Sequence, residues 1–163
     1  MKRLSRVAYY MQLANLVAQR STCYRAKVGA VLVHEGKIVA TGYNGSVPHG
    51  QHCIDEGCLL YEGHCIRTIH AEMNAILHLE RLYADLILYC THEPCLSCFK
   101  ALITVNVRSI YYFHKYTCHE RELVLADIPV PIRPRLFREP LDLLKENIKD
   151  DNEIIDGSPE QIL

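Results

Sequence analysis

The chain has 163 residues, 49% of them hydrophobic, with 18 Lys and Arg against 19 Asp and Glu and a formal net charge of -1. That length suits one domain with one core. The basic residues are scattered and attract nucleic-acid phosphates only weakly, and no apolar run approaches the roughly 20 residues of a membrane span. We expect a soluble, cytoplasmic protein that binds neither membranes nor nucleic acids.

The first residues predict a helix followed by a β-hairpin. The apolar residues at the start recur at helical spacing, at Leu4, Val7, Ala8, Met11 and Ala14. Gln12 and Asn15 interrupt this apolar stretch, which argues against a signal peptide. Residues 28–33 and 37–43 are rich in β-formers and are joined by a Glu-Gly-Lys turn, as expected for a hairpin.

Residues 44–69 show no periodicity and contain three Cys and three His. A long irregular segment in a compact domain is usually functional, and something must order it. The chain has eight Cys in all, but a secreted disulfide scaffold is usually a shorter chain without a full-sized core. We therefore expect reduced thiols, some of them metal ligands.

The second half of the chain alternates helices and strands. A helix is expected from His70, a strand at 86–90, a helix from Cys95 to about Asn106 and a strand at 109–113. This alternation predicts an α/β layer fold whose sheet is at least partly parallel.

The C-terminal part is expected to hold a short helix at 141–148, within a single domain of residues 1–150. Residues 151–163 form an acidic tail with few large apolar groups, which we expect to be mobile.

Three residues form a metal-binding pattern. Cys95 and Cys98 stand one turn apart after Pro94, at the expected start of a helix, where exposed N–H groups favour thiolates. His70, 25 residues earlier, makes three N/S ligands, the number in catalytic zinc sites that keep one position for water. Glu72, two residues after His70, is then free to move protons.

The pattern His-x-Glu followed by Pro-Cys-x-x-Cys is typical of zinc deaminases that act on nucleobases. The alternative interpretation treats each part as structural. His70 would cap a helix, Glu72 would be a solvated acid, and the two Cys would form a redox pair or half of a zinc knuckle.

The sequence resembles the deoxycytidylate (dCMP) deaminases of the cytidine deaminase-like superfamily over about residues 4 to 128. The stretches that carry the resemblance are RSTCYRAKVGAVLV, IVATGYNGSVPHG, GHCIRTIHAEMNAIL, LYCTHEPCLSCFKALI and VRSIYYFHKY. The resemblance implies a three-layer α/β/α sandwich around a mixed five-stranded sheet. It also implies hydrolysis of dCMP to dUMP and ammonia.

The resemblance assigns roles to particular residues. His70, Cys95 and Cys98 would hold zinc, whose hydroxide attacks C4 of the base, and Glu72 would shuttle protons. The implied substrate contacts are the backbone N–H of Ala71 and the side chains of Asn44, Asn74 and Tyr116. The candidate phosphate contacts are Arg25, Lys27 and Arg67.

The resemblance further suggests a second, structural zinc, for which the candidate ligands are Cys23, Cys53, Cys58, His64 and Cys65. Cys23 and Cys53 are the stronger candidates, and free buried thiols are the alternative. Regulation by dCTP with Mg²⁺ and by dTTP, through a site near the GYNG loop, is also implied, as is a homo-oligomer, often a hexamer.

Two stretches depart from the family pattern. The helix after Glu72 lacks the usual Gly-containing connection, so we expect it to stop near Tyr83. Asn106 stands where a Gly commonly ends the third helix, and Asn can adopt the same left-handed conformation.

Two other functions compete with dCMP deamination. One is another zinc deaminase on the same core, acting on tRNA adenosine, cytidine or guanine. The other is a non-enzymatic zinc-stabilised interaction module, which would need four protein ligands and no role for Glu72.

Overall fold

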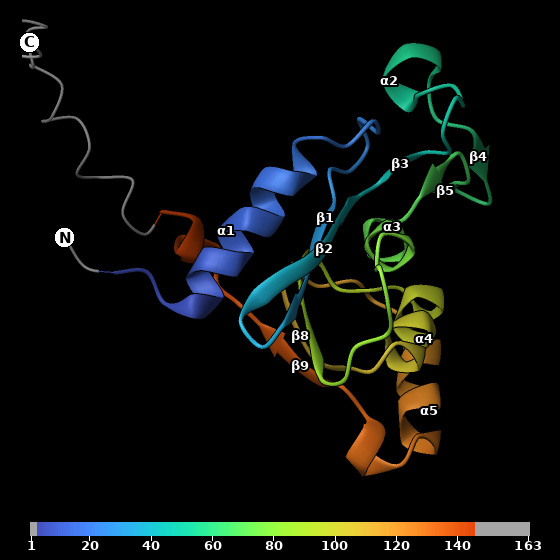
Figure 1. The fold of residues 1–163 in the computed structure, drawn as a ribbon. Coiled ribbons are helices and arrows are strands. Elements are labelled where there is room, and N and C mark those ends of the chain that lie inside the picture. Colours follow the sequence, from blue (N-terminus) through green and yellow to red (C-terminus); the bar gives the residue numbers. More distant parts are fainter. Residues whose placement is uncertain (1–2, 146–163) are drawn as a thin grey trace, which may run out of the picture.

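A mixed five-stranded sheet forms the centre of the computed structural model, which describes residues 3–145 (Figure 1). The strands run in the order β2-β1-β7-β8-β9. Their bounds are Gly29–His34 for β1, Lys37–Tyr43 for β2, Leu86–His92 for β7, Val107–His114 for β8 and Arg135–Arg138 for β9. β1 is antiparallel to β2 and β7, whereas β7, β8 and β9 are parallel. This confirms the expected hairpin and mixed sheet.

Helices cover both faces of this sheet. α1 (Arg6–Ala18) packs on one face, and α3 (Ala71–Leu77), α4 (Leu96–Thr104) and α5 (His119–Asp127) lie on the other (Figure 1). The remaining helices are α2 (Cys53–Glu56), η1 (Val130–Ile132) and η2 (Leu141–Lys145). The expected three layers are therefore present. The acidic segment 151–163 and the end of the helix expected over 141–148 lie outside the described residues.

The irregular segment 44–69 contains two short ladders instead of a large element. β3 (Gly45–Ser46) pairs with β6 (Thr68–Ile69), and β4 (Leu60–Tyr61) pairs with β5 (His64–Cys65). The segment thus leaves the central sheet at the end of β2, and its last short strand, β6, ends just before α3 begins.

Alternating side chains of β7 supply both cores. Leu86 and Leu88 are fully buried on the α3 and α4 side, and Tyr89 belongs to the core beneath α1. A fully buried Leu contributes roughly 1.5–3 kcal/mol, so the strand that leads into the Cys95 loop is among the best anchored in the fold.

The helix after Glu72 ends earlier than expected, at Leu77 instead of near Tyr83. Its end tightens into i→i+3 bonds from His78 N–H to Ala75 and from Leu79 N–H to Ile76. Leu77 is 65% exposed, whereas Leu79 and Tyr83, beyond the helix end, still pack against the core.

Asn106 adopts the left-handed conformation expected of it, with φ of 66°. Its side-chain N–H also donates to the carbonyl of Tyr83 at 3.2 Å. The two stretches that depart from the family pattern therefore brace each other.

All eight Cys are free of disulfide bonds in the structure. Across residues 3–145, no helix has the length and apolar character to cross a membrane.

Close contact between β2 and α3 yields a stability prediction. A Cβ on Gly42 would collide with the Ala71 carbonyl and the Ala75 backbone, so Gly42→Ala should force α3 outward. We expect a loss of about 1–3 kcal/mol in the free energy of unfolding, measured by urea denaturation. Thr41→Val on the exposed face of the same strand is the matched control and should change it by less than about 0.5 kcal/mol. Equal stability of both variants would contradict this packing.

Candidate metal centre and active site

The beginnings of α3 and α4 bring three metal-type donors together. His70 is the N-cap of α3, Cys95 is the N-cap of α4, and Cys98 lies in the first turn of α4. His70 Nδ1 is 3.5 Å from the Sγ of both Cys95 and Cys98, and all three donor atoms lie within 4.8 Å of one another. The three residues predicted from their spacing therefore converge.

The spacing of these donors fits zinc. With Zn–N near 2.0–2.1 Å and Zn–S near 2.3 Å, tetrahedral angles separate nitrogen and sulfur by about 3.6 Å. The donors here are already at 3.5 Å. Three ligands, within the part of the chain that the structure describes, leave one tetrahedral position for a fourth group.

The two sulfurs differ in ionisation. The hydrogen bond from Cys98 and the neighbouring His70 lower the pKa of Cys95 to about 4, despite burial. The Cys95 thiolate in turn raises the pKa of Cys98, as does burial. The hydrogen bond to Cys95 also raises the pKa of His70. Cys95 is thus held as the thiolate, the form that binds metal.

Glu72 lies in the first turn of α3, beside the donors but not among them. Its side chain is only 4% exposed, and burial raises its pKa to about 7, with His70 opposing the shift. A buried carboxyl that exchanges its proton near neutrality is suited to general acid and base chemistry.

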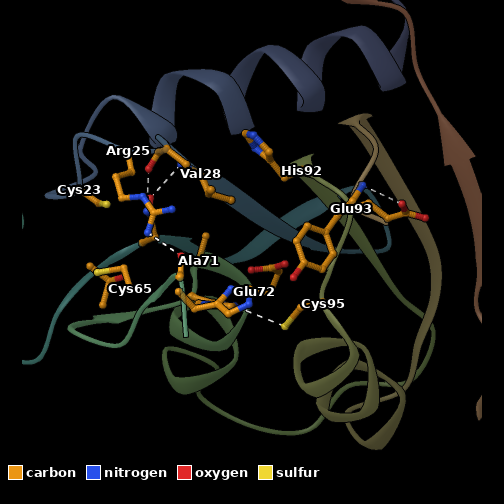
Figure 2. Close-up of a pocket in the computed structure, with 16 residues that line it drawn as sticks. Cys23, Arg25, Val28, Cys65, Ala71, Glu72, His92, Glu93 and Cys95 are labelled. Atoms are coloured by element: carbon orange, nitrogen blue, oxygen red, sulfur yellow. Dashed lines mark hydrogen bonds between the residues drawn. The ribbon is translucent and has the colours of Figure 1, made fainter. Parts of the chain in front are cut away.

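A cavity of about 310 Å³ opens beside these residues (Figure 2). His70, Ala71, Glu72 and Cys95 line one part of it. Other lining residues come from the chain before β1, from segment 44–69 and from the chain after β8, including Arg25, Asn44, His64 and Tyr116. Cavities of this size accept small-molecule ligands.

Asn44 and Asn74 take different places. Asn44 lines the cavity, but its amide braces the chain before β1, accepting from Val28 N–H and donating to the Ala26 carbonyl, both at 2.8 Å. Asn74 donates to the Tyr43 carbonyl at 2.9 Å, fastening α3 to β2, and is not among the lining residues.

The three basic residues predicted as phosphate contacts also lie in different places. Arg25 lines the cavity, where its guanidinium donates to the Gly63 carbonyl at 3.0 Å. Lys27 is exposed and does not line it. Arg67 donates to the side chain of Gln51 at 3.3 Å, away from the lining.

A buried ion pair, of which Glu93 lines the cavity, was missed by the sequence reasoning. Arg121 of α5 bonds to Glu93 at 2.7 Å and to the Pro94 carbonyl at 2.9 Å. The second oxygen of Glu93 accepts from Tyr116 N–H at 3.0 Å. The network ties α5, the loop before Cys95 and the chain after β8 together. The one sequence feature that could have indicated this ion pair is the position of Glu93, immediately before Pro94.

Four Cys form a second cluster. Cys23 and Cys58 sulfurs are 3.7 Å apart, and those of Cys53 and Cys65 are 3.6 Å apart. All four sulfurs lie within 4.8 Å of one another. A tetrahedral zinc with four thiolates has sulfurs about 3.8 Å apart, so the spacing fits. His64, also a candidate ligand, lines the cavity and is not in the cluster.

The cluster thiols are not equivalent. Burial raises the pKa of Cys53 to about 12. Burial opposes ionisation of Cys65, but the N–H of Arg67 and the neighbouring thiols lower its pKa to about 7. One thiolate is therefore readily available to a metal.

Residues 4–114 match the model of the cytidine and deoxycytidylate deaminase zinc-binding region. The chain is 45% identical over 122 residues to ComE operon protein 2 of Bacillus subtilis, covering 73% of this chain and 65% of that protein. It is 34% identical over 141 residues to deoxycytidylate deaminase of Saccharomyces cerevisiae, covering 81% and 45%. The matched region thus spans less than two thirds of either relative.

A solved structure agrees in fold and sequence. The dCMP deaminase of cyanophage S-TIM5, in complex with dCMP and dUMP, superposes with a TM-score of 0.66 at 32% identity, covering 80% of this chain and 94% of that one. From the matched region and this likeness, we conclude that the chain belongs to the cytidine and deoxycytidylate deaminase family, whose zinc-binding region it carries.

Proposed function

We propose that the protein hydrolyses dCMP to dUMP and ammonia at the cavity beside His70, Cys95 and Cys98. The observation that carries this proposal is the three-donor cluster with a buried carboxyl next to it. A non-enzymatic zinc module would want a fourth protein ligand and would gain nothing from burying Glu72.

In this proposal His70, Cys95 and Cys98 hold the zinc. When bound, the metal supplies a water whose pKa falls from about 15.7 to about 7. Glu72 would accept a proton from the attacking water and pass it to ring N3, and it would then take the proton of the new hydroxyl on C4 and give it to the departing amine. The backbone N–H of Ala71, at the start of α3, donates to the carbonyl oxygen of the base.

The positively charged side chain of Arg25 at the cavity supports a nucleotide substrate. Arg25 is the predicted phosphate contact that reaches the lining, and its bond to Gly63 holds the guanidinium there. The names of the yeast and cyanophage relatives point to the same substrate. Tyr116 also lines the cavity, and in this proposal it covers the base.

Comparing turnover of dCMP, cytidine, guanine and a tRNA anticodon stem would separate this activity from the other deaminases.

Cys23, Cys53, Cys58 and Cys65 are proposed to hold a second, structural zinc. The convergence of four thiols, two of them buried, on a segment with few large elements is otherwise unexplained, and a metal would offset the entropy of ordering that segment. Effects of dCTP with Mg²⁺ and of dTTP, and a homo-oligomer, stay predictions from the resemblance, and a cytoplasmic location stays a prediction from the sequence.

The role of Glu72 is tested by Glu72→Gln. The amide keeps the shape of the side chain but cannot accept the proton, so kcat for dCMP should fall by about 10²–10⁴-fold while bound zinc is retained. Ultraviolet assay of dCMP conversion and zinc analysis are the two measurements. Glu80→Gln, exposed beyond α3, is the control and should behave as wild type. Wild-type turnover by Glu72→Gln would contradict the mechanism.

The role of Arg25 is tested by Arg25→Gln. Loss of a charged contact to the phosphate should raise KM for dCMP by roughly 10–100-fold, whereas turnover of deoxycytidine, which has no phosphate, should stay unchanged. Lys27→Gln removes a positive charge two residues away and should alter neither substrate. If Lys27→Gln raised KM and Arg25→Gln did not, the assignment would be reversed.

The second zinc is tested by metal content. We expect two zinc ions per wild-type chain and one in Cys53→Ser, with a melting temperature at least about 5 °C lower. Cys118→Ser, outside both clusters, should keep two ions. One ion in the wild-type protein would dismiss the structural site.

A further inference from the structure

His92 lines the cavity but has no part in the mechanism above. It is the last residue of β7, three positions before Cys95. In Figure 2 its ring lies toward α1, whereas Glu72 and Cys95 lie toward α3 and α4. It is thus a polar side chain on a different part of the cavity wall from the metal donors.

Hydrogen bonds from a neighbouring strand determine which ring nitrogen of His92 carries the proton. The N–H of Gly29 donates to Thr91 Oγ1 at 3.1 Å, and the same oxygen is 3.0 Å from His92 Nδ1. Thr91 is buried, at 3% exposure, so its hydroxyl proton needs an acceptor. Within residues 3–145, Nδ1 is the acceptor recorded for it.

Because Nδ1 accepts this proton, the hydrogen of a neutral imidazole must be on Nε2. Burial lowers the pKa of His92, and the nearby His114 lowers it further. The two rings lie with centroids 4.6 Å apart. His92 is therefore uncharged near neutral pH and presents one N–H donor at Nε2.

The position of this donor suggests its acceptor. A nucleotide with its base at the metal donors and its phosphate at Arg25 must place its sugar between them. Along that wall, Val28 has an apolar side chain and the amide of Asn44 already bonds to Val28 and Ala26. The strongest acceptor on a deoxyribose facing this wall is its 3′-hydroxyl.

We propose that Nε2–H of His92 donates to the 3′-hydroxyl of the bound nucleotide, making His92 a specificity-determining residue for the sugar. Thr91 is the positioning residue that holds His92 in the donating tautomer. This inference rests on the proposed function, because it assumes a nucleotide in the cavity.

The test compares dCMP with 2′,3′-dideoxy-CMP, which lacks the acceptor. His92→Phe keeps an aromatic ring but loses the donor, so kcat/KM should fall roughly tenfold for dCMP and stay unchanged for the dideoxy analogue. His92→Gln, which retains an N–H donor, should recover part of the loss. The control is His114→Phe, because His114 packs against His92 but does not line the cavity. This variant should keep the wild-type preference for dCMP over the dideoxy analogue.

The tautomer itself is tested by ¹⁵N NMR of the ring in the zinc-loaded protein. Wild type and Thr91→Ser, which keeps the hydroxyl, should show His92 protonated at Nε2. Thr91→Val should show a mixture of tautomers and a weaker preference for dCMP over the dideoxy analogue.

Three results would overturn the inference. These are a wild-type ring protonated at Nδ1, an equal loss for both substrates in His92→Phe, or no loss for either. If wild type turned over neither nucleotide, the proposed function would fail and this inference with it. An active wild type with an unchanged ratio in His92→Phe would refute the inference alone.

Discussion

The candidate metal centre depends on holding the first turns of α3 and α4 close together, so that His70, Cys95 and Cys98 can bind one metal ion. On the α3 side, Gly42 allows the helix to lie close to β2, and Asn74 fastens it to the Tyr43 carbonyl. On the α4 side, Arg121 holds Glu93 and the Pro94 carbonyl. Each helix is thus attached near its first turn, where a small displacement would most change the distance between His70 and the two sulfurs.

The Arg121 and Glu93 pair is costly to bury. Two charges removed from water are best tolerated when their remaining hydrogen-bonding groups are also used. Here the pair also bonds to Pro94 and Tyr116, while the buried Nε of Arg121 has no partner among the described residues. Breaking such a pair by removing one partner usually costs about 3–5 kcal/mol. The network therefore links the stability of α5 to the geometry of the Cys95 loop.

The two sulfur-rich clusters share a wall of the cavity. Cys23 and Cys65 belong to the four-cysteine cluster and also line the cavity that holds Glu72 and Cys95. Arg25 and Gly63, which are joined by a hydrogen bond, lie close in sequence to those two cysteines. Ordering of the four-cysteine cluster would therefore also restrict the proposed phosphate end of the cavity.

The sequence by itself determined the alternation of strands and helices and the three donors with Glu72, because these depend on periodicity and on spacing around helix starts. It also identified Asn106 as a left-handed residue, since that preference is local. Only the tertiary structure decided that α3 ends at Leu77, that His64 leaves the second cluster, and that Arg25, not Lys27 or Arg67, reaches the cavity. Arg121 and the Thr91 bond to His92 were likewise decided there. Each of these outcomes depends on which distant segments pack together, and such tertiary contacts produce no periodic pattern in a single sequence.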